Sequence, residues 1–325
     1  GKKIGRQESL CTPHIYDLNE YIGTGIHEMT ICVSNVGYKT KGGHLTSPDT
    51  QTNWNGITGR IELIGYKNAH AENVMLWCDI HSKTVRVTAN ITGEKNGKAV
   101  ISAESFNSEK NHTPAVQSFE YTNGKLDAVY KMGDDCLLWS EHEPNLYKLR
   151  IDIDGDMSEH IIGMREFNTE GGKFTINGEK TFLRGKHDGM IFPKTAFAPT
   201  DLEEWLRVMK ISKSYGMNHY RYHTCCPPES AFIAADMLGI YMEPQLPFWG
   251  TITEEGEENH NQEEQDFLVE EGFNMLKFFG NHPSYCMMSM GNELWGSKKI
   301  LNDIIGGYKK FDNRHLYTQG SNNFQ

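Results

Sequence analysis

The chain divides into two parts by the period of its hydrophobic residues. Up to about residue 166, apolar and polar positions alternate in short segments, which predicts β-strands that bury one face. The clearest of these segments are 27–33, 59–64, 84–91, 98–101 and 146–151. After about residue 167, short apolar runs alternate with stretches of helical period, so strand–helix–strand units are predicted there.

The second part contains five predicted strands in order along the chain. They span 181–184, 218–222, 240–243, 285–290 and 315–319. Helices are predicted from about residue 200, where Thr200 and Glu203 form a capping box, and over 228–238, 262–280 and from about 298. Alternating β and α elements predict a parallel sheet, and five such strands fit the first part of a (β/α)8 barrel.

The expected fold class is therefore multidomain, with β domains followed by an α/β domain. At 325 residues the chain exceeds what one hydrophobic core usually fills. We expect an all-β region over 1–66, a β-sandwich over 67–166 and an α/β region over 167–325. A whole (β/α)8 barrel needs roughly 250 residues, so the barrel is expected to be incomplete.

Composition excludes several classes of function. The net charge is −11 without a clustered basic stripe, which argues against nucleic acid as a partner. No apolar run approaches the ~18 residues of a membrane span. The seven cysteines are an odd number without CxxC spacing, so we expect free, mostly buried thiols. Gly1 opens the chain without an initiator Met or signal core, so the N-terminus is expected to be processed or cut, and a periplasmic, secreted or cytoplasmic location stays open.

Polar and aromatic residues follow the predicted strands of the barrel region. They are His187 and Asp188 after the first strand, Arg221, His223 and Thr224 after the second, Gln245 and Trp249 after the third, and Asn292, Glu293 and Trp295 after the fourth. The carboxyl ends of barrel strands carry the catalytic groups. A carboxylic acid, an amide, imidazoles and indoles on one face suit a sugar, which offers hydroxyls and a C–H face.

Each of these candidates also has a structural interpretation. Glu293 is the candidate acid, but it could instead cap the following helix. His187 and His223 could be ordinary hydrogen-bonding residues, and Trp249 could belong to the core. Arg221 could be a buried cation that holds carboxylates without touching a ligand.

Two stretches in this region resemble signatures of glycoside hydrolase family 2, the family of β-galactosidases and β-glucuronidases. The run 218–229, Asn-His-Tyr-Arg-Tyr-His-Thr-Cys-Cys-Pro-Pro-Glu, is similar to its first signature, and the run 280–293, from Gly-Asn-His-Pro-Ser to Gly-Asn-Glu, is similar to its acid/base signature. Further similar stretches are 51–57, 138–147, 163–165, 176–178 and 183–185. The matches occur in order over nearly the whole chain.

The resemblance implies a chain truncated at both ends. It would comprise a partial jelly-roll β-sandwich of the sugar-binding type over 1–66, an immunoglobulin-like β-sandwich over 67–166, and the first five βα units of a TIM barrel over 167–325. The implied activity is hydrolysis of terminal β-glycosidic bonds by a retaining mechanism. Glu293 would be the general acid/base, Asn292 would bond the sugar 2-hydroxyl, and the remaining substrate-binding residues would be His223, Arg221, His187, Asp188, Trp249 and Trp295.

The sequence departs from the family pattern in three ways. His223 precedes Thr224 where the family commonly has Ser-His, and Gln245 stands where a Glu often ends the third strand. The family's nucleophile comes from the seventh strand, so it is expected outside this chain, which would be inactive alone. Asp236, Glu243 and Glu270 are expected to point away from the site.

The expected partner is a carbohydrate β-glycoside, with no cofactor, no metal, no nucleic acid and no membrane. Homo-oligomer formation and the identity of the sugar stay open. One alternative is a non-catalytic carbohydrate-binding protein or inactive fragment. A second is a metal-dependent barrel hydrolase that uses His187, Asp188 and His223.

Overall fold

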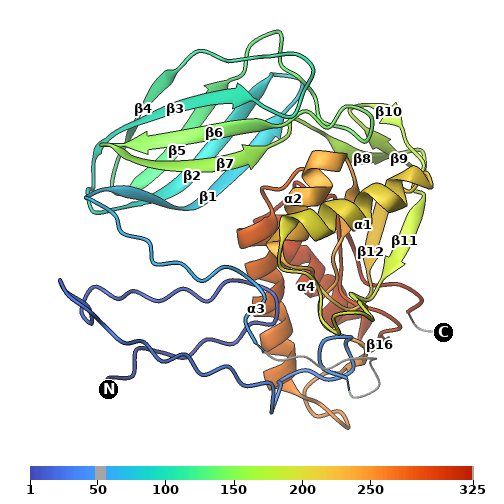
Figure 1. Ribbon diagram of the computed structural model, residues 1–325. Coiled ribbons are helices and arrows are strands. Elements are labelled where there is room, and N and C mark those ends of the chain that lie inside the picture. Colours follow the sequence, from blue (N-terminus) through green and yellow to red (C-terminus); the bar gives the residue numbers. More distant parts are fainter. Residues whose placement is uncertain (48–55, 324–325) are drawn as a thin grey trace.

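The computed structural model describes residues 1–47 and 56–323, and it contains a β-sandwich, an α/β region and an N-terminal segment without strands (Figure 1). The sandwich lies at one end of the α/β region, and the N-terminal segment runs past helix α3 (Figure 1). Part of the motif at 51–57, residues 51–55, lies outside the described residues.

The sandwich consists of two antiparallel sheets that bury alternate side chains between them. One sheet has the order β1-β2-β5, with β1 at His70–Asp79, β2 at Thr84–Thr92 and β5 at Lys125–Lys131. The other has the order β4-β3-β6-β7, with β4 at Gln117–Tyr121, β3 at Gly97–Ser105, β6 at Tyr147–Ile153 and β7 at Asp156–Ile162. In β5, Leu126, Ala128 and Tyr130 are buried while their neighbours are exposed, as period-two alternation predicts.

The α/β region places five parallel strands side by side in chain order within the described residues. Strands β11 (Gly185–Asp188), β12 (His219–Tyr222) and β13 (Tyr241–Glu243) form one parallel sheet, and β15 (Met287–Ser289) pairs with β17 (Leu316–Thr318). Parallel bridges from Met242 to Tyr285 and from Gln245 to Ser289 join the two groups. The predicted order of parallel strands is therefore present.

Helices and short strands complete the α/β region. The helices are α1 (Leu202–Ser214), α2 (Glu229–Leu238), α3 (Gln262–Phe279) and α4 (Lys298–Phe311). Strands β8 (Phe167–Glu170), β9 (Lys173–Ile176) and β10 (Glu179–Lys180) form a small antiparallel sheet next to the sandwich, and β14 (Thr251–Ile252) pairs with β16 (Trp295–Gly296). None of the helices in the described part of the chain is long and apolar enough to cross a membrane.

The start of the α/β region differs from the sequence-based prediction. The first parallel strand is 185–188 rather than 181–184, because the Asn218 side chain takes the place of a strand partner. Its Oδ1 accepts from the Arg184 backbone N–H at 2.7 Å, and its Nδ2 donates to the Phe182 carbonyl at 3.1 Å. Helix α1 is capped by Asp201, whose side chain accepts from the Glu204 N–H at 2.8 Å, so the cap lies one residue after Thr200.

The N-terminal segment also differs, because neither 27–33 nor 59–64 forms a strand. Apolar side chains in and beside these stretches, such as Ile26, Ile31 and Leu63, are exposed. An alternating segment becomes a strand only when a neighbour supplies ladder hydrogen bonds and an apolar layer to bury. No described strand lies beside these residues, so the strands of a jelly roll are not formed in the described part of 1–66.

The 280–283 stretch of the second signature joins the sandwich to the α/β region. Asn281 accepts from the Leu76 N–H and donates to the Val74 carbonyl, both on β1. Its Oδ1 also accepts from Arg314 Nη1 at 2.7 Å, and the same Arg314 nitrogen donates to the Leu76 carbonyl at 2.8 Å. Strand β1 has an irregular register between Glu72 and Met75, and Val74 of this junction lies within it. This part of the signature therefore has a structural role.

The described cysteines are all free, as expected, but only three of the seven are buried. Cys225, Cys226 and Cys286 are buried in the α/β region, whereas Cys32 is exposed and the other three are half-buried. The expectation that most are buried is therefore wrong.

Candidate active site

Glu293 lies in a turn that follows the carboxyl end of β15. Gly291 has φ 147°, and a Cβ at this position would lie 2.2 Å from the Phe248 carbonyl oxygen, so only glycine fits. Glu293 itself has φ 50°, a left-handed conformation that is uncommon for a residue other than glycine. Such conformations cost free energy and often occur at functional sites.

The Glu293 turn is held from both sides by neighbouring loops. The Glu293 backbone N–H donates to the Ser321 carbonyl at 2.8 Å, and the Asn292 N–H donates to the Phe248 carbonyl at 3.3 Å. The half-buried Glu293 side chain accepts from Asn322 Nδ2 through Oε1 at 3.3 Å. The carboxylate therefore lies at the carboxyl end of the sheet, between the loops that follow β15 and β17.

Asn292 is held by Arg221. Its side chain is only 5% exposed, and its Oδ1 accepts from Arg221 Nη2 at 2.7 Å. Because this bond occupies the carbonyl oxygen, the amide N–H₂ group of Asn292 is the end available to a ligand. Arg221 Nε is buried without a hydrogen-bond partner among the described residues, so this donor is also open to an acceptor.

Strand register places Glu243 on the same face as Arg221 and His187. His187 on β11 pairs with Arg221 on β12, and Arg221 pairs with Glu243 on β13. Residues paired across parallel strands point to the same face. The expectation that Glu243 points away from the site is therefore wrong. The Glu243 Oε2 lies 3.3 Å from Nε2 of His219, which is two positions before Arg221 on β12. Asp236 binds His282, and Glu270 is exposed on α3, so both lie away as expected.

His223 is the centre of a cluster of rings. Its ring centroid lies 4.9 Å from that of His187, 5.1 Å from that of Trp249 and 4.6 Å from that of His44. Burial lowers the pKa of His223 to about 4, and the nearby His44, Arg221 and His187 contribute in the same direction. His223 is therefore a neutral imidazole at neutral pH, with one donor and one acceptor nitrogen.

Thr224 follows His223 in a strained conformation. It has φ 53°, which is a real outlier for a β-branched residue. Its backbone N–H donates to Gln245 Oε1 at 2.8 Å, and the Gln245 Nε2 is buried without a hydrogen-bond partner among the described residues. Strained backbone and an unpaired buried amide at the ends of adjacent strands support a ligand site here.

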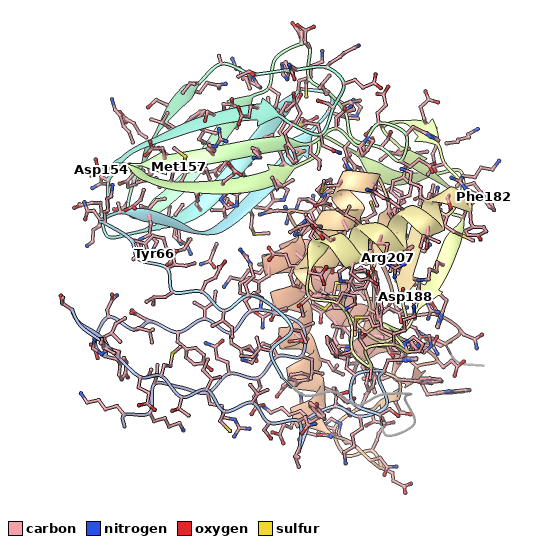
Figure 2. All side chains as sticks on the ribbon, in the orientation of Figure 1. Tyr66, Asp154, Met157, Phe182, Asp188 and Arg207 are labelled. Carbon is pink, nitrogen blue, oxygen red and sulfur yellow. The ribbon has the colours of Figure 1, made fainter. Side chains whose placement is uncertain are left out.

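Asp188 does not join this group. It ends β11 (Figure 2) and pairs with Tyr222. The Tyr222 ring contacts that of Trp205 on α1, so this face of the strands is covered by a helix. The Asp188 carboxylate accepts from Lys186 Nζ at 2.8 Å and from the Met190 N–H at 2.7 Å. These contacts give Asp188 a structural role. The alternative of a metal site made by His187, Asp188 and His223 therefore lacks a carboxylate ligand. Across the described residues no three His, Cys, Asp or Glu side chains are grouped to hold a metal ion.

The two predicted indoles are both partly exposed. Trp249 is 41% exposed beside His223, and Trp295 is 47% exposed on β16, two residues after Glu293. Trp249 is therefore not a core residue. Partly exposed rings near the strand ends are what stacking on a sugar would require.

Two residues of this site, Glu243 and His44, are not among the candidates predicted from the sequence. Glu243 could have been found by counting positions, because it aligns with Arg221 in the parallel register. His44 carried no signal, because it lies in a turn-rich segment 179 positions before His223 in the chain.

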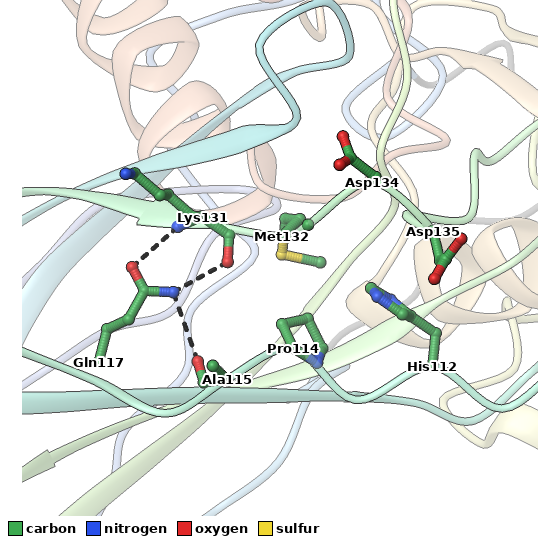
Figure 3. A pocket seen from close by; sticks show the side chains of 9 residues that line it. His112, Pro114, Ala115, Gln117, Lys131, Met132, Asp134 and Asp135 are labelled. Atoms are coloured by element: carbon green, nitrogen blue, oxygen red, sulfur yellow. Dashed lines mark hydrogen bonds between the residues drawn. The ribbon is translucent and has the colours of Figure 1, made fainter.

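The sandwich has a pocket of its own, shown in Figure 3, and the side chains of Gln117 and His112 in its lining are hydrogen-bonded to the protein. Gln117 donates to the Ala115 and Lys131 carbonyls and accepts from the Lys131 N–H (Figure 3). His112 is hydrogen-bonded to the Tyr147 hydroxyl at 2.7 Å. This pocket therefore offers less free chemistry than the strand ends.

Comparison with known proteins finds similar sequences along nearly the whole chain. The family model described as glycosyl hydrolases family 2 matches residues 69–165. A β-galactosidase of Halalkalibacterium halodurans is 24% identical over 322 residues, which cover 93% of this chain and 31% of that protein. The large subunit of a β-galactosidase from Lactobacillus acidophilus is 24% identical over 344 residues, covering 97% of this chain and 52% of the subunit. The chain thus spans about a third to a half of these relatives.

Solved structures share the fold. A glycosyl hydrolase family 2 member from Bacteroides cellulosilyticus superimposes with a TM-score of 0.64 at 20% identity, covering 79% of this chain and 36% of that structure. A β-glucuronidase of Parabacteroides merdae superimposes with a TM-score of 0.62 at 18% identity, covering 77% of this chain and 33% of that structure. Together with the matched model over residues 69–165 and the relatives along the chain, they support membership of the chain in glycosyl hydrolase family 2.

Proposed function

We propose that the protein hydrolyses terminal β-glycosidic bonds with retention of configuration, and that Glu293 is the general acid/base. The observation that carries this proposal is the Asn292–Glu293 pair at the carboxyl end of β15. Arg221 fixes the amide. His187, which pairs with Arg221 across the strands, lies in a ring cluster with the buried His223 and the partly exposed Trp249. We propose further that the five parallel strands are the first part of a (β/α)8 barrel.

The proposed reaction has two steps. In the first, a second carboxylate attacks the anomeric carbon while the Glu293 carboxylic acid protonates the leaving oxygen, which gives a glycosyl-enzyme and a free alcohol. In the second, the Glu293 carboxylate takes a proton from water as the water attacks the anomeric carbon, which releases the sugar and restores both carboxyl groups. In the proposal, the second carboxylate comes from outside these 325 residues. We call the protein that carries both carboxylates the complete enzyme.

The remaining residues would bind and orient the sugar. The Asn292 amide would bond the 2-hydroxyl, and Arg221 would act through Asn292 by holding its carbonyl oxygen at 2.7 Å. His223 and His187 would bond other hydroxyls, and Trp249 and Trp295 would stack on the C–H face. The names of the similar proteins favour a galactoside or a glucuronide as the first substrates to test.

One alternative has an observation in its favour. Glu243 is the only other carboxylate that we find on the site-facing row of the described strands, and it lies beside His219 rather than near Asn322. A site with one free carboxylate binds a sugar without turning it over. The alternative is therefore a carbohydrate-binding protein that keeps the pocket.

The 325-residue chain by itself provides the test. We expect it to bind aryl β-galactoside or aryl β-glucuronide, which would quench the fluorescence of exposed Trp249 and Trp295, and to release no aryl alcohol. A proton donor without its nucleophile supplies only part of the rate. Absence of binding to any aryl β-glycoside would count against a glycoside site. Hydrolysis by the chain that Glu243→Gln abolishes would place the nucleophile at Glu243.

In the complete enzyme, Asn292→Ala should lower kcat more than it weakens substrate binding. Hydrogen bonds to the 2-hydroxyl strengthen in the oxocarbenium-like transition state. A loss of about 10- to 100-fold in kcat corresponds to roughly 1.4–3 kcal/mol of transition-state binding. Steady-state kinetics with a 2-deoxy substrate are the control, because that substrate should be nearly indifferent to the change. An equal loss on both substrates would remove the 2-hydroxyl from the role of Asn292.

A further inference from the structure

His44 reaches the site from the N-terminal segment. Gly42 bridges to Phe248, and the Thr40 hydroxyl donates to the Pro247 carbonyl at 3.3 Å. These contacts attach the segment to the loop that follows β13. The His44 backbone N–H then donates to Thr224 Oγ1 at 2.8 Å, so the segment is tied to the ends of two adjacent strands.

The position of the His44 ring is set by two neighbours, His223 and Gly189. The ring meets the His223 ring edge-on, with centroids 4.6 Å apart and planes at 83°. The ring also lies against Gly189, where a Cβ would be 3.0 Å from His44 Cε1 and Nδ1. A larger residue at 189 would push against the imidazole. The ring is half-buried, so it has both a protein face and a solvent face.

We propose that His44 is a further residue of the sugar-binding pocket, which positions the His223 imidazole toward a hydroxyl of the bound β-glycoside. This inference rests on the proposed function and deepens it. The N-terminal segment would then complete the pocket wall beside His223, and the site would include a residue from outside the α/β region.

The hydrogen-bonding of His223 explains why a positioning residue is needed. Its Nδ1 lies 3.4 Å from Thr224 Oγ1, and that hydroxyl oxygen also accepts from the His44 N–H. The edge contact with His44 restricts rotation of the His223 ring, which leaves Nε2 for the ligand. An imidazole that is neutral can either donate to or accept from a sugar hydroxyl.

The charged and titratable groups around His223 define a readout. They are His44 on the N-terminal segment, His187 on β11 and Arg221 on β12, and all three lower its pKa in addition to burial. Removing His44 takes away one such group and opens the ring to water. Both changes favour the protonated form, so the pKa of His223 should rise.

The experiment compares His44→Ala with His44→Phe and His14→Ala in the 325-residue chain. His14 is exposed on the same segment, so its variant is a matched control. Binding of non-hydrolysable aryl β-thiogalactoside and β-thioglucuronide is measured by fluorescence, and the imidazole C2–H of His223 is titrated by NMR. His44→Ala should weaken binding by about tenfold and raise the His223 pKa. His44→Phe should recover most of the binding, because it keeps a ring edge against His223.

Each possible result either supports or overturns the proposed role of His44. Weaker binding and a shifted His223 titration for His44→Ala, with both unchanged for His14→Ala, would support it. An unchanged His223 titration, or unchanged binding in His44→Ala, would overturn it and leave the proposed function intact. If the unchanged chain binds neither thioglycoside, the proposed function and the sugar role of His44 fail together, and the titration still shows whether the two rings meet.

Discussion

Glu293→Gln in the complete enzyme is expected to lower hydrolysis of unactivated β-glycosides by about 10²- to 10⁴-fold, the usual contribution of acid/base assistance. Glutamine has nearly the same shape but cannot transfer the proton to the leaving oxygen. The left-handed backbone at 293 and its hydrogen bond to Ser321 do not depend on the carboxylate, so the fold should survive. Turnover and circular dichroism of the variant measure the two effects.

The leaving group separates an acid from a merely structural carboxylate. An aryl alcohol of low pKa departs without protonation, so the glycosylation rate on such substrates should fall less than that on alkyl glycosides. Glu270→Gln is the matched control, because Glu270 is exposed on α3 and should leave both rates unchanged. Equal losses for good and poor leaving groups would assign the proton-donor role elsewhere.

Asp312→Asn is expected to destabilise the protein by about 3–5 kcal/mol, the usual cost of leaving a buried charge without its partner. The Asp312 side chain is fully buried. It accepts from Arg314 Nε at 2.8 Å through Oδ1, and its Oδ2 lies 3.2 Å from His315 Nε2. Arg314 also binds the Leu76 carbonyl on β1. The substitution should therefore loosen the junction between the sandwich and the α/β region. Trp77, whose ring lies 5.3 Å from the Arg314 guanidinium, reports on it by fluorescence in urea.

The stabilisation that the Asp312 carboxylate provides should be lost as the pH falls. Burial alone would raise the pKa of Asp312, but His315 and Arg314 hold it well below its usual value. A depressed carboxyl pKa contributes stability above the unfolded value of about 3.9 and loses it as the pH falls. The difference between the natural chain and Asp312→Asn should be constant above about pH 5 and shrink below pH ~4.

The control for Asp312 is the same substitution at the surface. Asp303 pairs with Lys299 on α4 at 2.8 Å, with both side chains mostly exposed. An exposed pair of this kind contributes about 0.3–0.5 kcal/mol, so Asp303→Asn should change stability little. A small effect at Asp312, similar to that at Asp303, would show that the Arg314 contacts with Leu76 and Asn281 hold the junction without the carboxylate.

The spacing of hydrophobic residues along the chain was enough to predict the positions of most strands and helices. The strands near 84–91, 98–101 and 146–151 and the helices near 228–238, 262–280 and 298 lie where the alternation predicts them. These elements bury one face on a neighbour from their own region, so their side-chain pattern reflects their environment directly. For the same reason the order of the five parallel strands and the position of Glu293 after β15 could be predicted from the sequence.

Tertiary structure alone decided which side chains meet. The segments 27–33 and 59–64 have strand patterns but no described neighbour, and without one the pattern does not form a strand. Asp188 and Glu243 look alike in sequence as acids near strand ends, yet the register turns Asp188 to the helices and Glu243 to the site. His44 reaches His223 only because Gly42 and Thr40 attach the segment to the loop after β13. Local pattern reports the environment of one residue, whereas a site depends on contacts between residues far apart in the chain.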